Sequence, residues 1–423
     1  IPNDSCPVKS DRLLGSTLRM LAPLGLVLMQ PLPALAQAVE SAPSYNAAQI
    51  RGIERVGANY TILTPVRSDG LMRNYIVKTP YDEHIVSGDA LLHVRLKELH
   101  TLALLEKVSN SETFGKSLAE AGISPLKYTG QLITNPLGTV KENFEGVGAM
   151  LGRIGAGLNN VGKSQDNAIE SLLGVTGDRR QIAAAYGVDP YTKYPPLDAK
   201  LKHLAEAAAL GGLAVSGALL AVAGPAGIVV SSLSTAYKIN NIAIDDLARQ
   251  YTSAQILDIN RDRLAAMGVR EDLNAAILAN HHYTPIDMAA MVAALDSMKG
   301  VAGRDVFIAH AVAADHHSTA YFMRRQAELM AKDHRSNGGY VQLIALGGLP
   351  FAVTRDGRIV TATPIDALSW TANTAARFGQ FSAERNRVSP KAAGELRITG
   401  QATALAKRQL KAQGWTVLEN QFP

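Results

Sequence analysis

Residues 207–237 read AAALGGLAVSGALLAVAGPAGIVVSSLSTAY, and no side chain in these 31 positions carries a formal charge. Such a stretch needs cover from protein or lipid, because contact between water and a large apolar surface is unfavourable. Two helical crossings of a bilayer need about 40 apolar residues, so the stretch is too short for a spanning hairpin. We expect a helical hairpin buried in a folded domain. The alternatives are a segment lying at a membrane surface and a single spanning helix.

Gly224 and Pro225 divide the stretch into two arms, 207–223 and 226–237, because proline interrupts the hydrogen-bond ladder of a helix. Most residues outside the Leu, Ile and Val positions are small, and small residues let helix backbones approach closely. The sequence therefore predicts a central Ala/Gly-rich helical hairpin. The side chains that we expect to contact a membrane or a partner on it are Leu213, Leu220 and Val229.

Composition places the chain among folded proteins with a sizeable core. It has 423 residues, of which 47% are hydrophobic and 19% charged, with 5% aromatic residues and a formal net charge of +5. The low aromatic content with abundant Ala and Gly favours helices packed through small residues. Because the basic residues are dispersed and do not form clusters with aromatics, we expect no nucleic-acid partner.

The N-terminal segment has the pattern of a secretory signal peptide. Lys9, Arg12 and Arg19 precede an apolar run at 20–32, and small residues suited to cleavage follow at 34–38. We therefore expect residues 1–38 to be a signal peptide and the protein to be exported to a bacterial periplasm or envelope. The single cysteine, Cys6, would leave with that segment, which excludes disulfides and thiol chemistry in the mature chain.

Local sequence patterns predict the secondary structure of most of the remaining chain. Residues 60–66 and 71–78 are expected to form a β-hairpin around the Asp69–Gly70 turn, with a third strand near 84–86 and a helix over 89–108. Towards the C-terminus, the segments 340–344, 351–354 and 358–363 predict a small antiparallel unit, and 415–418 a last strand. The expected C-terminal helices are 242–251, 253–267, 271–280, 284–298, 304–334, 366–378 and 401–412.

Two further patterns bear on function. Phe144, Val147 and Leu151 form an apolar stripe at helical spacing among glycines, which suits contact with a membrane or partner. Residues 157–164 (GLNNVGKS) satisfy the phosphate-loop pattern G-x-x-x-x-G-K-[ST]. A phosphate loop follows a buried strand, and no such strand is predicted before residue 157, so we expect a polar helix end and loop instead.

Histidines supply the candidate metal ligands. His310 and His317 fall on one face of the expected helix 304–334, about 10.5 Å apart along its axis. That separation is long for one metal ion, so a third ligand, His282 or its neighbour His281, would have to close the site. No cofactor is identified by the sequence.

These observations together predict an α+β protein that is mainly helical, with small antiparallel β-hairpin units near both termini. The expected divisions are 1–38, 39–110, 111–250 (which contains the hairpin 207–237) and 251–423. We expect an exported, non-catalytic envelope scaffold or binding protein that contacts a membrane surface or an envelope protein. The alternatives are a periplasmic metal-dependent hydrolase that uses the histidines and a protein that inserts into membranes conditionally.

Overall fold

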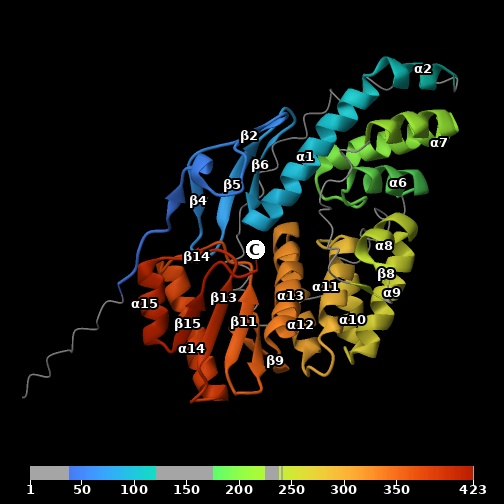
Figure 1. Cartoon of the computed structure of the whole chain (residues 1–423). Helices are drawn as coiled ribbons and strands as arrows, with labels where there is room; N and C mark the ends of the chain where they lie inside the picture. The colour runs from blue at the N-terminus through green and yellow to red at the C-terminus, as the bar shows by residue number, and fades with distance from the viewer. Residues whose placement is uncertain (1–37, 121–174, 224–237, 240–241, 423) are drawn as a thin grey trace, which may run out of the picture. The chain divides into compact units, whose positions relative to one another are not determined.

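The computed structural model describes residues 38–120, 175–223, 238–239 and 242–422. Within these ranges helices predominate and are combined with two larger β-sheets (Figure 1), so the predicted α+β class is confirmed. The N-terminal strands come first, a long series of helices follows, and the second larger sheet lies near the C-terminus.

The first sheet is antiparallel and confirms the β-structure predicted near the N-terminus. Its central strand β5 pairs with β4 at its start, with β3 at its end and with β6 along most of its length. Tyr75 and Val77 on β5 are buried, because alternate residues of a strand face the same side. Its strands are β1 (Ser44–Tyr45), β2 (Val56–Gly57), β3 (Tyr60–Ile62), β4 (Val66–Ser68), β5 (Arg73–Lys78) and β6 (Glu83–Ser87).

The helix predicted at 89–108 is confirmed as α1, which packs on β6 and on α7. Helix α7 begins at Pro195. Proline is favoured in the first turn of a helix, because the backbone N–H that it lacks would have no partner within the helix there. This helix ends at Ala223, so it includes the first arm of the apolar stretch. The helices of this region are α1 (Asp89–Ser109), α2 (Glu112–Glu120), α6 (Gly177–Tyr186) and α7 (Pro195–Ala223).

The second arm of the apolar stretch lies outside the described residues, so the hairpin remains a prediction. In the parts of the chain that the structure describes, none of the helices has the length and apolar character needed to cross a membrane.

The helices from residue 244 to 337 agree closely with the sequence patterns, with one correction. The helix expected over 304–334 is two helices, because the polypeptide leaves the helical path between Ala311 and His317. There the Asn280 side-chain amide donates hydrogen bonds to the carbonyls of Val312 (3.0 Å) and Ala314 (2.9 Å), which a continuous helix would use internally. The helices are α8 (Ile244–Gln250), α9 (Ser253–Ala266), α10 (Glu271–Leu278), α11 (Pro285–Ser297), α12 (Arg304–Ala311) and α13 (His317–Asn337).

The second sheet has the order β15-β13-β11-β10-β9. The expected antiparallel unit at 340–363 is present, but β13, which the sequence patterns did not identify, joins β11 and β15 in parallel, so the sheet is mixed. Its strands are β9 (Tyr340–Leu346), β10 (Leu349–Thr354), β11 (Ile359–Thr363), β13 (Gly394–Ile398) and β15 (Trp415–Leu418).

Two helices accompany this sheet, α14 (Ala372–Val388) and α15 (Ala404–Ala412). The helix expected at 366–378 begins later, because the backbone N–H groups of Asp366 and Ala367 both donate to the Leu71 carbonyl. The next residues, β12 (Ala367–Leu368), pair with β14 (Gln401–Ala402), which delays the start of the helix predicted at 401–412 as well.

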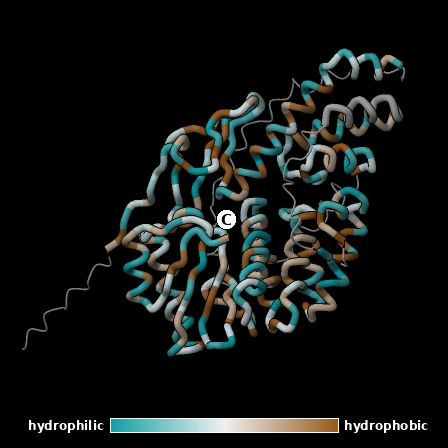
Figure 2. The backbone as a smooth tube through the Cα atoms, viewed as in Figure 1, coloured by the Kyte–Doolittle hydropathy of each residue, from teal (hydrophilic) through white to brown (hydrophobic). Residues whose placement is uncertain are grey.

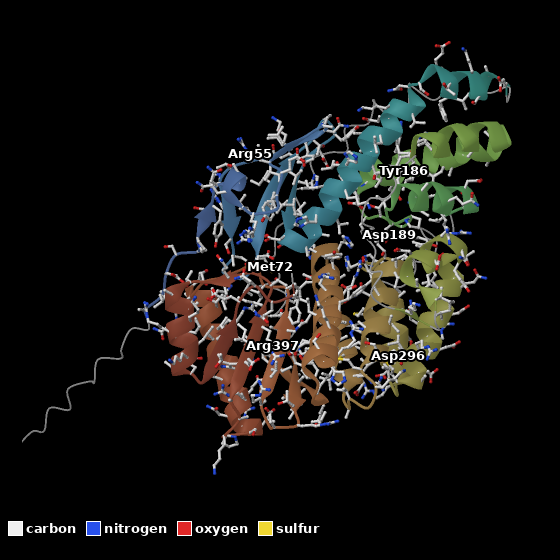
Figure 3. All side chains as sticks on the ribbon, viewed as in Figure 1. Arg55, Met72, Tyr186, Asp189, Asp296 and Arg397 are labelled. Atoms are coloured by element: carbon white, nitrogen blue, oxygen red, sulfur yellow. The ribbon has the colours of Figure 1, made fainter. Side chains whose placement is uncertain are left out.

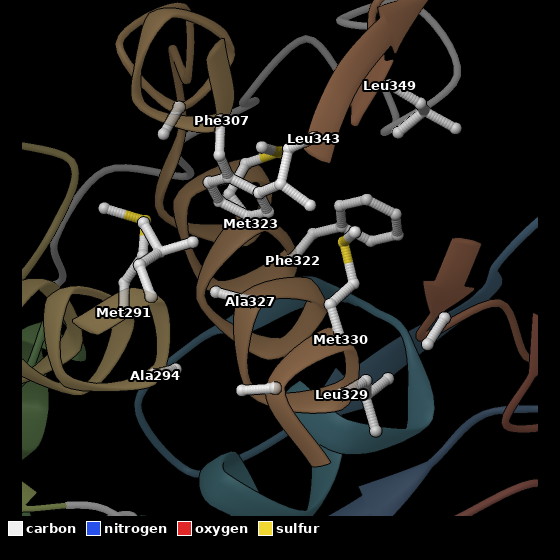
Figure 4. Close-up of a cluster of buried hydrophobic side chains, with 14 of the residues drawn as sticks. Met291, Ala294, Phe307, Phe322, Met323, Ala327, Leu329, Met330, Leu343 and Leu349 are labelled. Atoms are coloured by element: carbon white, nitrogen blue, oxygen red, sulfur yellow. The ribbon is translucent and has the colours of Figure 1, made fainter. Parts of the chain in front are cut away.

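Buried apolar side chains form two separate cores, and Figure 2 shows hydrophobic residues on the helices and on the strands. The larger core lies among helices α8 to α15 and the second sheet. Figure 4 shows the part where Met291 and Ala294 of α11 lie beside α13. The smaller core lies among the first sheet, α1, α2, α6 and α7, and includes Tyr321 from α13. The polar contacts between the elements of these two cores form the candidate site.

Candidate functional site

A polar cavity lies where elements of both cores meet. Helix α1 and the connection between α6 and α7 form one side, and the N-terminal ends of α11 and α13 form the other. Figure 3 marks Asp189, which lies on the connection between α6 and α7. The acidic, basic and histidine side chains that line the cavity are Glu98, Asp189, Lys193, Asp287, His317 and Arg324.

The N-terminus of α11 fixes one wall. Thr284 caps the helix: its hydroxyl accepts a hydrogen bond from the Asp287 N–H (3.0 Å), and the Asp287 carboxylate accepts one from the Thr284 N–H (3.4 Å). The Thr284 hydroxyl also donates to Asp189 Oδ2 at 2.6 Å. Thr284–Pro285 stands at the start of the helix expected over 284–298, since Thr is a favoured cap and Pro a favoured first helical residue. This capping box is what orients Asp287 into the cavity.

Arg324 of α13 holds two buried acids. Its Nη1 donates to Asp287 Oδ1 at 2.7 Å and its Nε to Glu328 Oε1 at 3.2 Å, and all three side chains are at most 5% exposed. Burial alone would raise the pKa of Asp287, but the neighbouring Arg324 cation, helped by His317, lowers it below its ordinary value. Asp287 is therefore a fixed negative charge at the cavity wall.

The pKa of Asp189 is shifted in the opposite direction to that of Asp287. Asp189 accepts hydrogen bonds from the Tyr191 N–H (2.8 Å) and from Thr284. Burial, with the nearby Asp287 carboxylate, raises the pKa of Asp189 to about 7. Burial also lowers the pKa of Lys193. The cavity thus contains two carboxyl groups whose pKa values are moved apart, an arrangement that is common at binding and catalytic sites.

The wall supplied by α1 carries a further pair of charges. Glu98 accepts a hydrogen bond from the Thr192 hydroxyl and lies 3.5 Å from Arg95 Nε. The Arg95 guanidinium lies over the Tyr194 ring, 4.0 Å from its centroid. Within the described residues, Nη1 of the buried Arg95 has no hydrogen-bond partner, so a donor remains available beside the cavity.

The cavity is small in this form. It leaves ≈ 20 Å³ for the centres of water-sized molecules. By the same measure one water needs roughly 10–15 Å³, so there is room for one or two waters. A larger ligand would have to move the walls apart.

Of the three predicted metal ligands, the cavity contains one. His317 is the first residue of α13; its Nδ1 donates to the His282 carbonyl (3.2 Å) and lies 3.7 Å from Asp287 Oδ2. Its pKa is lowered by burial. His310 is on α12, where its Nδ1 bonds to the Val306 carbonyl (2.7 Å). Among the described residues, no three His, Cys, Asp or Glu side chains are arranged to hold a metal ion.

The predicted membrane or partner contacts receive no side-chain description. Phe144, Val147, Leu151 and Val229 lie outside the described residues, as does the phosphate-loop match at 157–164. Leu213 and Leu220 lie on α7, in the part for which the backbone alone is described.

Sequence reasoning missed most of the cavity. Glu98, Asp189, Lys193 and Arg324 are separated by long stretches of chain and resemble ordinary surface charges when the sequence is read linearly. The one usable signal was the Thr284–Pro285 helix start, since a capping acid at Asp287 follows from it. Comparison with protein-family models, curated proteins and solved structures finds no match for this chain.

Proposed function

We propose that this protein is an exported, non-catalytic binding protein of the cell envelope and that its ligand binds in the polar cavity. The observation that carries the proposal is that one cavity is lined by side chains of both charges, contributed by elements of both cores. Small-ligand sites occur preferentially at such junctions, where a few polar groups converge.

The ligand that suits this lining is small and carries both charges. Three carboxyl groups, Glu98, Asp189 and Asp287, disfavour a simple anion. Lys193 and Arg324 disfavour a simple cation. In the described part of the chain, the Lys193 ammonium group lines the cavity and makes no hydrogen bond, so it can pair with a ligand carboxylate. A zwitterion such as a free amino acid satisfies both requirements, and glycine is its smallest probe.

Export and envelope association rest on the sequence. The basic residues before the apolar run at 20–32 support secretion. The uncharged stretch 207–237, whose first arm lies in α7, supports contact with a membrane surface or an envelope protein. Export and envelope association do not depend on which ligand the cavity binds.

A thermal-unfolding series tests the binding site. Glycine, acetate and methylammonium are each added at millimolar concentration to the full chain and to two variants, Lys193→Met and the control Lys202→Met, which changes an exposed lysine on α7. A ligand that binds the folded state raises Tm. We expect glycine to raise Tm in the wild type and in Lys202→Met, with little effect in Lys193→Met.

Acetate and methylammonium, which each carry one charge, should raise Tm less than glycine. The proposal would be overturned if none of the probes raised Tm, or if glycine raised it equally in Lys193→Met. An equal rise in that variant would mean that glycine stabilises the protein without occupying the cavity.

A further inference from the structure

Two carboxyl groups from distant parts of the chain are held by the same residue, Thr284. Its hydroxyl donates a hydrogen bond to Asp189 Oδ2 (2.6 Å), and its backbone N–H donates one to Asp287 Oδ2 (3.4 Å). Asp189 lies on the connection between α6 and α7, whereas Asp287 is in the first turn of α11. Both carboxyl groups line the cavity, so a ligand that enters it meets a pair of acids.

Asp189 can accept more hydrogen bonds than it receives. Within the described residues, its Oδ1 accepts one from the Tyr191 N–H (2.8 Å) and its Oδ2 accepts one from the Thr284 hydroxyl. Each oxygen of a carboxylate has two acceptor positions, so one position on each oxygen stays available. Asp189 is half-buried and lines the cavity, where a ligand can reach it. An ammonium group, which has three N–H donors, suits these positions.

The charges around Asp189 leave its carboxylate without a paired cation. Arg324 is hydrogen-bonded to Asp287 and Glu328. In the part of the chain that the structure describes, Lys193 makes no ion pair with Asp189, although each affects the charge of the other. The charged or titratable groups that surround Asp189 are Glu98 of α1, Tyr191 and Lys193 of the connection, Asp287 of α11, and His317 and Arg324 of α13, with Arg179 of α6 bonded to the Pro190 carbonyl behind it.

A proton holds the position beside Asp189 below neutral pH. Burial, with the Asp287 carboxylate nearby, raises the pKa of Asp189 to about 7, because a second negative charge next to Asp287 is unfavourable. A positive group placed against both carboxylates removes that cost. A proton and a ligand ammonium group therefore compete for Asp189.

We propose that the ammonium group of the zwitterion binds against Asp189 and Asp287 while its carboxylate faces Lys193, and that binding displaces the proton of Asp189. This inference rests on the proposed function, because it describes how the same cavity holds its ligand. The O–H bond of protonated Asp189 breaks, its electron pair stays on the carboxylate oxygen, and the proton passes to the buffer. The carboxylate then accepts a hydrogen bond from the ammonium group, so the affinity for the ligand depends on pH.

Calorimetric titration of the full chain with glycine counts the protons released, when it is repeated in two buffers with different enthalpies of ionisation. Phosphate and imidazole serve at pH 6, and phosphate and Tris at pH 8. We expect about one proton to be released per glycine at about pH 6 and close to none at about pH 8, since Asp189 is mostly protonated at the first and mostly ionised at the second. The affinity should be about 10-fold lower at about pH 6 than at about pH 8.

Two probes and two variants assign the proton. Methylammonium should release the same proton and acetate none, because only a cation competes with it. Asp189→Asn should bind glycine more weakly than the wild type at pH 8, with equal affinity at the two pH values and no proton release. Asp262→Asn, which changes an exposed acid of α9, should behave as the wild type does.

The outcomes separate this inference from the function on which it rests. Glycine binding with equal affinity at both pH values and without proton release would overturn the inference and leave the proposed function standing. Proton release that persisted in Asp189→Asn would also overturn it, because another group would then be the source. If glycine bound at neither pH, the proposed function would fail and the inference with it.

Discussion

The Asp366 carboxylate accepts a hydrogen bond of 3.0 Å from the backbone N–H of Asp89, although 277 positions separate the two residues. Asp89 is the first residue of α1, and Gly88 before it has no side chain that could cap the helix. Asp366 also accepts from the Arg73 N–H (3.3 Å). It therefore supplies, from the loop after β11, the cap that α1 lacks, and it joins the second sheet to the elements of the smaller core.

Replacing Asp366 with Ala should lower the free energy of unfolding by about 1–2 kcal/mol, the upper part of the range for a lost helix cap. Burial, with Asp89 nearby, raises the pKa of Asp366 well above its ordinary value, so a neutral amide is a close substitute. Asp366→Asn should lose much less. Urea unfolding of both variants measures this, and equal stability of Asp366→Ala and the wild type would show that the cap is unimportant.

The raised pKa of Asp189, about 7 against an ordinary value of 3.8, makes stability depend on pH. Between these values the folded protein holds a proton that the unfolded chain has released, so the free energy of unfolding falls as pH rises from about 4 to 7. In Asp189→Asn this contribution is absent. Urea unfolding across that range should show that the difference in stability between wild type and variant changes steadily with pH and levels off above 7.

The titration of His282 changes the free energy of unfolding with pH in the opposite direction to that of Asp189. The wild type is therefore compared with Asp189→Asn, in which the His282 contribution is the same. Burial, with the neighbouring imidazoles, lowers the pKa of His282 to about 4. Its unfolded form therefore binds more protons between pH 4 and 6.5, and stability rises with pH in that interval. A difference between wild type and Asp189→Asn that stayed constant from pH 4 to 8 would contradict the assignment for Asp189.

Arg324→Met should be severely destabilising, because it leaves the buried Asp287 and Glu328 without their common partner. Removing one member of a buried ion pair costs about 3–5 kcal/mol. The double variant Arg324→Met/Asp287→Asn should recover part of that loss, since it removes the buried charge of Asp287, while Glu328 keeps its ion pair with Arg325. Denaturant unfolding of both proteins tests this, and a loss below about 1 kcal/mol for Arg324→Met would be inconsistent with the buried network.

Two glycine-to-alanine changes should act in opposite directions. A Cβ added at Gly400 would lie 1.8 Å from the Asp366 backbone oxygen, so Gly400→Ala should destabilise by about 1–3 kcal/mol through overpacking. Gly379 lies in α14 with open space around it, and Gly379→Ala should stabilise the helix by about 0.5–1 kcal/mol. Thermal unfolding distinguishes them, and a neutral Gly400→Ala would mean that this junction is loosely packed.

Local chemistry made part of the fold predictable. The Thr284–Pro285 helix start, the helix over 89–108 and the strand at 415–418 are short-range features, and the structure contains each of them. Strand β13 was missed because its Glu395 and Arg397 resemble exposed charges. In the fold Arg397 is buried and paired with Asp333 and Glu395.

The candidate site was less predictable because it depends on contacts between distant segments. The predicted spacing of His310 and His317 assumed one continuous helix. The helix breaks because the side chain of Asn280, which is distant in the sequence, donates hydrogen bonds to two carbonyls at the break. Asp189 and Lys193 lie beside and within the segment 190–196, whose prolines at 190, 195 and 196 are typical of a turn-rich connection. No local periodicity indicates that such a connector faces α11 and α13.

The central claim is that ligand binds where elements of the two cores meet, and hydrogen exchange of the full chain with and without glycine tests it most directly. We expect glycine to slow amide exchange in residues 187–195 and 282–290, which contribute Asp189, Lys193, Thr284 and Asp287 to the cavity. Unchanged exchange in both segments, at glycine concentrations that raise Tm, would contradict the claim.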